Sequence, residues 1–61
     1  MKIKEVIKLV EQDGWFWKRT NGSHRIYKHP IKPGTVVIAY RGAKDVPEGT
    51  LKSILKQAGL E

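Results

Sequence analysis

Two short stripes of aliphatic residues, one near each end of the chain, constrain its fold most. The spacing i, i+3, i+4, i+7 holds in one stripe for Ile3, Val6, Ile7 and Val10, and in the other for Leu51, Ile54, Leu55 and Ala58. This spacing predicts amphipathic helices over residues 3–13 and 48–58. Gly14 and Gly59 follow them, where a left-handed C-terminal cap is usual. Neither helix can bury its stripe alone, so both need a shared partner surface.

The middle of the chain can supply that surface. Residues 15–20, 23–29 and 35–40 are rich in aromatic and β-branched side chains, which predicts three strands. Asn21-Gly22 is a strong hairpin signal, because both residues tolerate positive φ. The order α-β-β-β-α predicts one two-layer α+β domain over residues 1–61, with two helices on one face of a three-stranded antiparallel sheet.

A two-residue turn at Asn21-Gly22 sets the expected hairpin register. Thr20 would pair with Ser23, and Trp17 with Ile26. We expect the helices to cover the more apolar face, the one with Trp15, Trp17 and Ile26, which in this register also carries Arg19, His24 and Lys28. The open face would then show Phe16, Lys18, Arg25 and Tyr27, and its two aromatic rings would either stack on bases or pair across the strands. A one-residue bulge would exchange part of this assignment.

Charge is segregated along the chain. The 61 residues carry a net charge of +6, and no Asp or Glu lies between Gly14 and Lys44. That acid-free stretch holds both histidines and the cations Lys18, Arg19, Arg25, Lys28, Lys32, Arg41 and Lys44. A field of one sign on one part of a small protein attracts polyanions such as nucleic acid. The alternative is a solvated surface that only keeps the protein soluble.

Missing residue types exclude several classes of function. Without cysteine there is no disulfide framework and no thiolate metal site, and two histidines alone cannot hold zinc. No run approaches the roughly 20 apolar residues of a membrane span, and no signal peptide is recognisable, so a soluble intracellular protein is expected. Ser23 has no Asp–His relay near it in the sequence, which argues against a serine hydrolase.

His24 is the candidate for chemistry, because an imidazole with a near-neutral reference pKa is a good general base. On RNA it could take the proton of a 2′-hydroxyl, whose oxygen then attacks the adjacent phosphate while cations stabilise the charge. The alternative is a surface histidine that binds phosphate or caps the hairpin. For His29, next to Pro30, a role in the turn is favoured over catalysis.

Two sets of residues resemble one known family. They are Gly14-Trp15, Arg19, Gly22-Ser23-His24, Tyr27 and His29-Pro30, and the closing run 49–60. Together they resemble the HicA-type toxins, which are small mRNA interferases, and the resemblance covers essentially the whole chain. It implies a double-stranded-RNA-binding-domain-like fold, cleavage of mRNA without a metal, and His24 as the catalytic residue. It also implies a HicB-type antitoxin as the partner protein.

One position departs from the family's pattern. Many relatives have a second histidine shortly after the third strand, where this chain has Tyr40-Arg41-Gly42. Two alternatives follow: the departure lowers the activity, or Arg41 replaces the electrostatic part of that histidine. The group that protonates the leaving 5′-oxygen stays open among Tyr27, Lys28, His29 and Arg41.

The hypothesis is therefore a cytoplasmic toxin that is a metal-independent endoribonuclease, with His24 catalytic and no cofactor. The residues expected to contact RNA are Lys18, Arg19, Gly22, Ser23, Arg25, Lys28, Arg41 and Lys44. The first alternative is a non-catalytic RNA-binding module of the same fold, and the second is an interaction protein whose basic surface serves only an acidic partner. Exposed sheet edges invite pairing, so a homodimer and a toxin–antitoxin hetero-oligomer both stay open.

Overall fold

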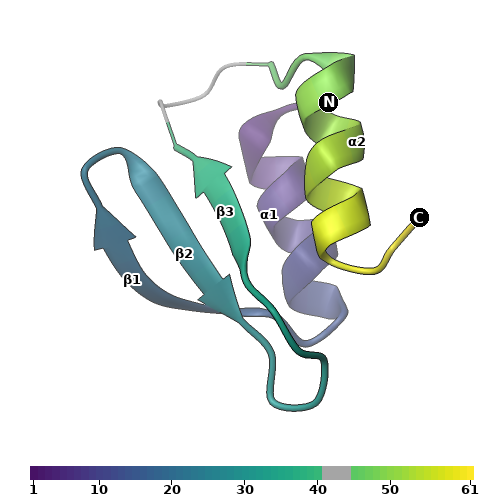
Figure 1. Cartoon of the computed structure of the whole chain (residues 1–61). Coiled ribbons are helices and arrows are strands. Elements are labelled where there is room, and N and C mark those ends of the chain that lie inside the picture. The colour runs from purple at the N-terminus through teal and green to yellow at the C-terminus, as the bar shows by residue number, and fades with distance from the viewer. Residues whose placement is uncertain (41–44) are drawn as a thin grey trace.

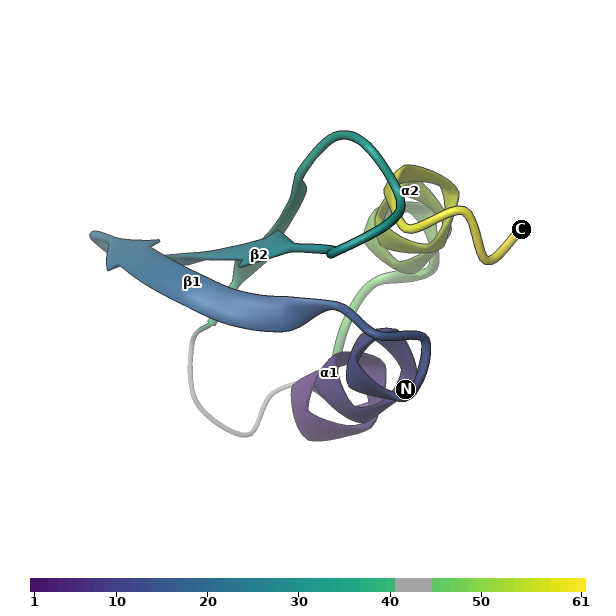
Figure 2. The same cartoon turned by 90° about the horizontal axis from the view of Figure 1, so that it is seen from below.

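The computed structural model describes residues 1–40 and 45–61 and has the predicted order α-β-β-β-α. The elements are α1 (Ile3–Gln12), β1 (Phe16–Asn21), β2 (His24–Lys28), β3 (Val36–Ala39) and α2 (Glu48–Gln57). The strands form one antiparallel sheet in the order β1-β2-β3. Figures 1 and 2 show both helices on the same side of this sheet. The predicted α+β architecture is confirmed.

Each helix ends one residue before the end of its expected range, 3–13 or 48–58, and two residues before the predicted glycine cap. Gly14 has a φ of 108° and Gly59 a φ of 71°. The next amide folds back onto the last turn in each case, in the hydrogen bonds Trp15 N–H to Val10 O at 3.1 Å and Leu60 N–H to Leu55 O at 2.8 Å. This is the Schellman arrangement, in which glycine takes the left-handed position that side chains disfavour.

The hairpin turns one residue later than expected. Its turn residues are Gly22 and Ser23, because Asn21 stays in β1 and pairs with His24. Thr20 therefore pairs with Arg25, so the expected pair of Thr20 with Ser23 is wrong. The shift of the turn has a conformational reason. Gly22 takes the positive φ of the turn, 65°, and no non-glycine residue of the described chain has a positive φ.

A bulge in β1 then changes the face of the strand's first residues. The ladder shifts by one residue between Trp17 and Arg19, and Lys18 is the extra residue. Trp17 pairs with Tyr27, so the expected pair of Trp17 with Ile26 is wrong. Trp17 and Tyr27 consequently share one face of the sheet, while Arg19 and Ile26 share the other.

The bulge also decides what the core contains. The helix-facing side of the sheet contributes the fully buried Tyr27, Val36 and Ile38, and Trp15 joins them at 2% exposure. The opposite face carries Phe16, Ile26 and Val37. The prediction that Trp15 is buried is confirmed. The predictions that put Tyr27 on the open face, and Ile26 with Arg19, His24 and Lys28 beneath the helices, were wrong. Phe16 is on the open face as expected and is 46% exposed.

Candidate functional site

His24 lies at one end of the open sheet face, opposite the helices. It is the first residue of β2, it is exposed, and it pairs with Asn21 on β1 and Ala39 on β3. Figure 1 shows that the β1–β2 hairpin, where His24 begins its strand, projects to one side of the two helices. The imidazole can therefore meet a polymeric substrate without any opening of the fold.

Two predicted RNA-binding cations share this face with His24. Arg19 is exposed and pairs with Ile26, the next same-face residue after His24 on β2, and Lys28 is the same-face residue after that. Same-face residues are about 7 Å apart along a strand, so Lys28 starts about 13 Å from His24. The long side chain of Arg19 can thus reach a phosphate that touches His24, whereas Lys28 is placed for a neighbouring phosphate.

Lys28 and Lys18 differ in how their side chains are held. Lys28 is half-buried, and its Nζ donates a hydrogen bond to Thr35 Oγ1 at 2.6 Å. Lys18 is exposed and occupies the bulge, where the strand bends. Lys28 is therefore a positioned cation, and Lys18 is one of the exposed charges on the sheet edge.

The two-residue turn that precedes His24 is exposed to solvent. Gly22 and Ser23 are exposed, and a Cβ built on Gly22 would meet no atom within 4 Å. The carbonyl oxygen of Ser23 accepts a hydrogen bond from the Tyr40 amide at 2.8 Å, which ties the turn to the end of β3. A phosphate could approach this turn closely while its conformation is held.

Arg25 lies on the helix-facing side, so the prediction that it shows on the open face was wrong. Its guanidinium carbon lies 3.9 Å from the ring centroid of Trp17 and 4.0 Å from that of Tyr40. The residue alternates with His24 along β2, which puts the two side chains on opposite faces. Arg25 is therefore not part of the surface around His24. The predicted contacts Arg41 and Lys44 lie outside the described residues.

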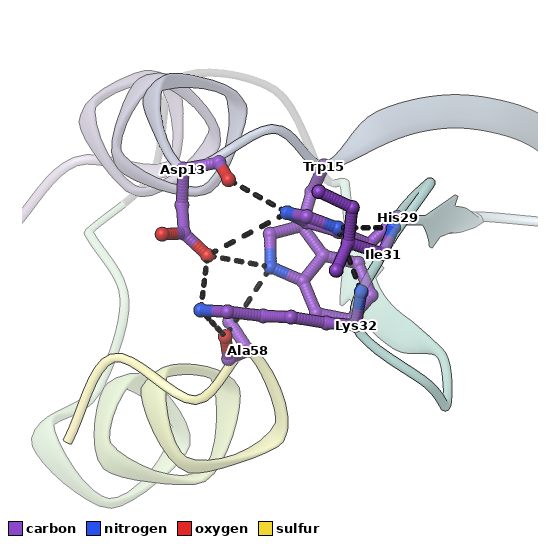
Figure 3. Close-up of polar contacts among 6 residues, drawn as sticks. All are labelled: Asp13, Trp15, His29, Ile31, Lys32 and Ala58. Atoms are coloured by element: carbon purple, nitrogen blue, oxygen red, sulfur yellow. Dashed lines mark hydrogen bonds and ion pairs between the residues drawn. The ribbon is translucent and has the colours of Figure 1, made fainter.

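His29 has a structural role, as predicted. Its side chain is 7% exposed, and its Nε2 lies 2.7 Å from the carbonyl oxygen of Asp13. Its Nδ1 accepts hydrogen bonds from the amides of Ile31 at 3.0 Å and Lys32 at 2.9 Å. The tautomer with its proton on Nε2 satisfies all three contacts, which hold the loop after β2 (Figure 3).

A polar cluster surrounds this histidine where α1 and α2 end (Figure 3). Lys32 Nζ donates to Asp13 Oδ2 at 2.5 Å and to the carbonyl oxygen of Ala58 at 3.2 Å. The indole Nε1 of Trp15 donates to the same two oxygens, at 3.2 and 3.3 Å. The hydrogen bond and charge of Lys32 hold the pKa of Asp13 below its usual 3.8, with smaller help from Trp15 and His29 and against the opposing effect of burial.

Burial removes two of the predicted general-acid candidates. The Tyr27 side chain is fully buried on the helix side, and its hydroxyl has no hydrogen-bond partner among the described residues. His29 is buried in the loop cluster. Lys28 begins about 13 Å from His24 along the strand, and its Nζ is already hydrogen-bonded to Thr35 Oγ1. The fourth candidate, Arg41, lies outside the described residues.

Residues 1–40 and 45–61 contain no group of three or more His, Cys, Asp and Glu side chains suited to holding a metal ion. No helix in this part of the chain is long and apolar enough to cross a membrane.

Sequence reasoning missed two clusters. One is the stack of Arg25 against Trp17 and Tyr40, and the other is the contact of Asp13 with Lys32. Asp13 is the last acid before the acid-free stretch, which could have marked it as a partner for a cation. The stack had no such signal, because it depends on the bulge.

Comparison with models of known protein families gives a match that covers nearly the whole chain. The model of the family described as HicA toxin of bacterial toxin–antitoxin matches residues 3–60. This range includes every described helix and strand. No curated protein matches the chain.

Proposed function

The chain belongs to the HicA toxin family of bacterial toxin–antitoxin systems, and we propose that it is an endoribonuclease that cuts mRNA through His24 without a metal ion. The supporting observation is the exposed imidazole on the open sheet face with Arg19 one same-face position away. The whole chain, residues 1–61, acts as one domain in this proposal. An mRNA target would place its action in the cytoplasm.

The proposed chemistry starts with neutral His24 as the general base. Its imidazole takes the proton of a 2′-hydroxyl, and the resulting oxygen attacks the adjacent phosphorus. The bond to the 5′-oxygen breaks, which leaves a 2′,3′-cyclic phosphate on one fragment. The leaving oxygen takes its proton from water or from a group outside the described residues. Arg19 stabilises the added charge on the phosphate, since a cation aimed at the developing charge favours the transition state.

The remaining predicted contacts would bind the strand on either side of the cut. Lys28 would hold a phosphate farther along β2, and Lys18 would add exposed positive charge at the β1 edge. The backbone of Gly22 and Ser23 would receive the nucleotide nearest the turn. The roles of Arg41 and Lys44 rest on their charge and on the resemblance alone.

The test is cleavage by His24→Ala. Purified parent and variant are incubated with labelled RNA in the presence of a chelator, and the fragments are counted over time. Loss of a general base lowers the rate about 10²- to 10⁴-fold. The variant should keep the circular dichroism of the parent, because His24 is exposed and outside the core. Equal cleavage by both proteins would contradict the role of His24.

The second candidate function is a non-catalytic RNA-binding module. It is favoured by Tyr40-Arg41-Gly42, which stands where many relatives have a second histidine. The same experiment separates the two functions, since a parent protein that binds RNA but releases no new fragments is a binding module.

The family's name implies a partner antitoxin. We propose a HicB-type protein that covers the face around His24 and thereby excludes RNA. Adding the antitoxin should then stop cleavage and RNA binding together. Cleavage that continues in the complex would contradict this mode of neutralisation.

A further inference from the structure

Three side chains, one each from β1, β2 and the residue after β3, form a stack on the helix-facing side of the sheet. We call Trp17, Arg25 and Tyr40 the Trp17 stack. The Arg25 guanidinium lies within 4.0 Å of both ring centroids, well inside the roughly 6 Å reach of a cation–π contact. Tyr40 packs against the buried core, so the stack runs from the core outward to Trp17.

Trp17 is held in place although it is in contact with water. Its side chain is 51% exposed, yet its Nε1 donates a hydrogen bond to Thr20 Oγ1 at 2.9 Å. This hydrogen bond depends on the bulge, which places Trp17 and Thr20 on the same face of the sheet although they are three residues apart in the sequence. Together with Arg25, the bond fixes the indole before any ligand arrives. A fixed ring loses little conformational freedom on binding.

The two tryptophans therefore differ in what they do. Trp15 is 2% exposed and its indole nitrogen is hydrogen-bonded inside the fold. Trp17 lies outside the buried core and leaves half of its surface open. Core packing explains the first tryptophan and does not explain the second.

The surroundings of Trp17 favour a nucleobase over a protein side chain. Protein hot spots are aromatic anchors within a well-packed, desolvated patch, whereas this ring neighbours the cations Lys18 and Arg25. Stacking of bases on rings among cations is how proteins bind single-stranded nucleic acid. β1 is an edge strand, so a strand of RNA that crosses this edge can touch the open face and Trp17 together.

We infer that Trp17 is a stacking platform for one unpaired base of RNA, and that Arg25 is the cation that holds the indole in position. This inference rests on the proposed function, because it assumes that RNA is bound near His24. It adds a base contact that the phosphate-binding residues of the open face do not provide.

The test uses a His24→Ala background, which removes cleavage and leaves binding. Affinity is measured for a single-stranded RNA of about 12 nucleotides, with and without Trp17→Leu. Loss of the stacked base should weaken binding about 10-fold. The slope of log affinity against log salt should not change, because no charge is removed. RNA should quench the tryptophan emission of the background protein but not that of Trp17→Leu, in which only the buried Trp15 remains.

Two control variants keep the result interpretable. Trp17→Phe retains an aromatic ring and should recover most of the RNA affinity. It keeps the test informative if Trp17→Leu folds poorly. Ile31→Ala removes another exposed apolar side chain, 86% exposed, and should bind RNA as the background protein does.

The outcomes separate the two proposals. If His24→Ala itself binds no RNA at low salt, the proposed function and the stacking platform both fail. If it binds RNA and Trp17→Leu binds equally well, only the stacking platform is overturned. A loss confined to antitoxin binding would likewise overturn it and would assign the ring to the protein partner.

Discussion

Two buried residues, Trp15 and Tyr27, carry polar atoms into the core with opposite results. The Trp15 indole finds two oxygen acceptors, Asp13 Oδ2 and the carbonyl oxygen of Ala58. The Tyr27 hydroxyl is buried and finds no partner among the described residues. An unpaired buried polar group costs about 1–3 kcal/mol. Tyr27 is therefore placed for the packing of its ring, not for the chemistry of its hydroxyl.

Tyr27→Phe tests whether the hydroxyl of Tyr27 contributes to stability or to activity. The substitution keeps the ring and removes the unpaired hydroxyl, so the free energy of unfolding should stay equal or rise by up to about 1 kcal/mol. Urea unfolding measures it. RNA cleavage should be unchanged, because the side chain is sealed on the face opposite His24. A loss of stability greater than about 1 kcal/mol would mean that the hydroxyl has a partner.

At the scale of the element, the cap of α1 depends on a close approach. Gly14 has a φ of 108°, and a Cβ at this position would lie 2.7 Å from Nε2 of His29. The His29 ring cannot move aside cheaply, because both of its nitrogens are engaged. Gly34 has a similar φ of 90°, but a Cβ there would meet nothing within 4 Å. Both glycines thus need a positive φ, but only at Gly14 would an added Cβ meet a neighbouring atom.

Gly14→Ala and Gly34→Ala separate these two effects. Both should lose roughly 1–2 kcal/mol of stability from the positive φ. Gly14→Ala should lose roughly 1–3 kcal/mol more, because the methyl group overpacks the site against His29. Urea midpoints of the parent and both variants give the comparison. Equal losses would show that the His29 ring yields to the added methyl.

At the scale of the whole molecule, Asp13 joins three segments that are far apart in the sequence. It lies at the end of α1, and Lys32 bridges it from the β2–β3 loop to the carbonyl of Ala58 at the end of α2. The Asp13 carboxylate is only 25% exposed. Because its pKa is lowered in the fold, ionised Asp13 stabilises the native state. That stabilisation is complete above the usual value of 3.8 and is lost as the pH falls through the lowered pKa.

The pH dependence of unfolding tests the role of Asp13. The urea midpoint of the parent should fall as the pH is lowered from about 5 to about 2, since protonation of Asp13 breaks the pair with Lys32. Asp13→Asn should have a lower midpoint near neutral pH and a shallower fall in acid. Asp45→Asn is the matched control, because Asp45 is 75% exposed in its ion pair with Lys2 and should matter little. Identical acid profiles for parent and Asp13→Asn would contradict this role.

The predicted helices were confirmed because their signals are local. The i, i+3, i+4, i+7 stripes and the glycines that follow them lie within one or two turns of chain, and helix geometry converts that spacing directly into a face. The strand order and the α+β architecture followed, since the two stripes needed one common surface. The structural role of His29 was also predicted correctly from its place beside Pro30.

The faces of the hairpin were predicted wrongly because they depend on single residues. The extra residue Lys18 in β1 put Trp17 on the same face as Tyr27 and thereby reversed the assignments of Tyr27 and Ile26, whereas the later turn changed the pairs but not the faces. A shift of one residue moves every following side chain to the other face of a strand. Arg25 consequently left the surface that holds His24 and joined Trp17 and Tyr40.

The order of elements, the acid-free basic stretch and His24 as the candidate base follow from the chain alone, because periodicity, charge and residue type are properties of the sequence. Three features depend on packing: the cations that share a face with His24, the tryptophan that is buried and the contact of Asp13 with Lys32. Those contacts join residues from different elements, and packing of the sheet against α1 and α2 selects among registers that the local sequence leaves nearly equal.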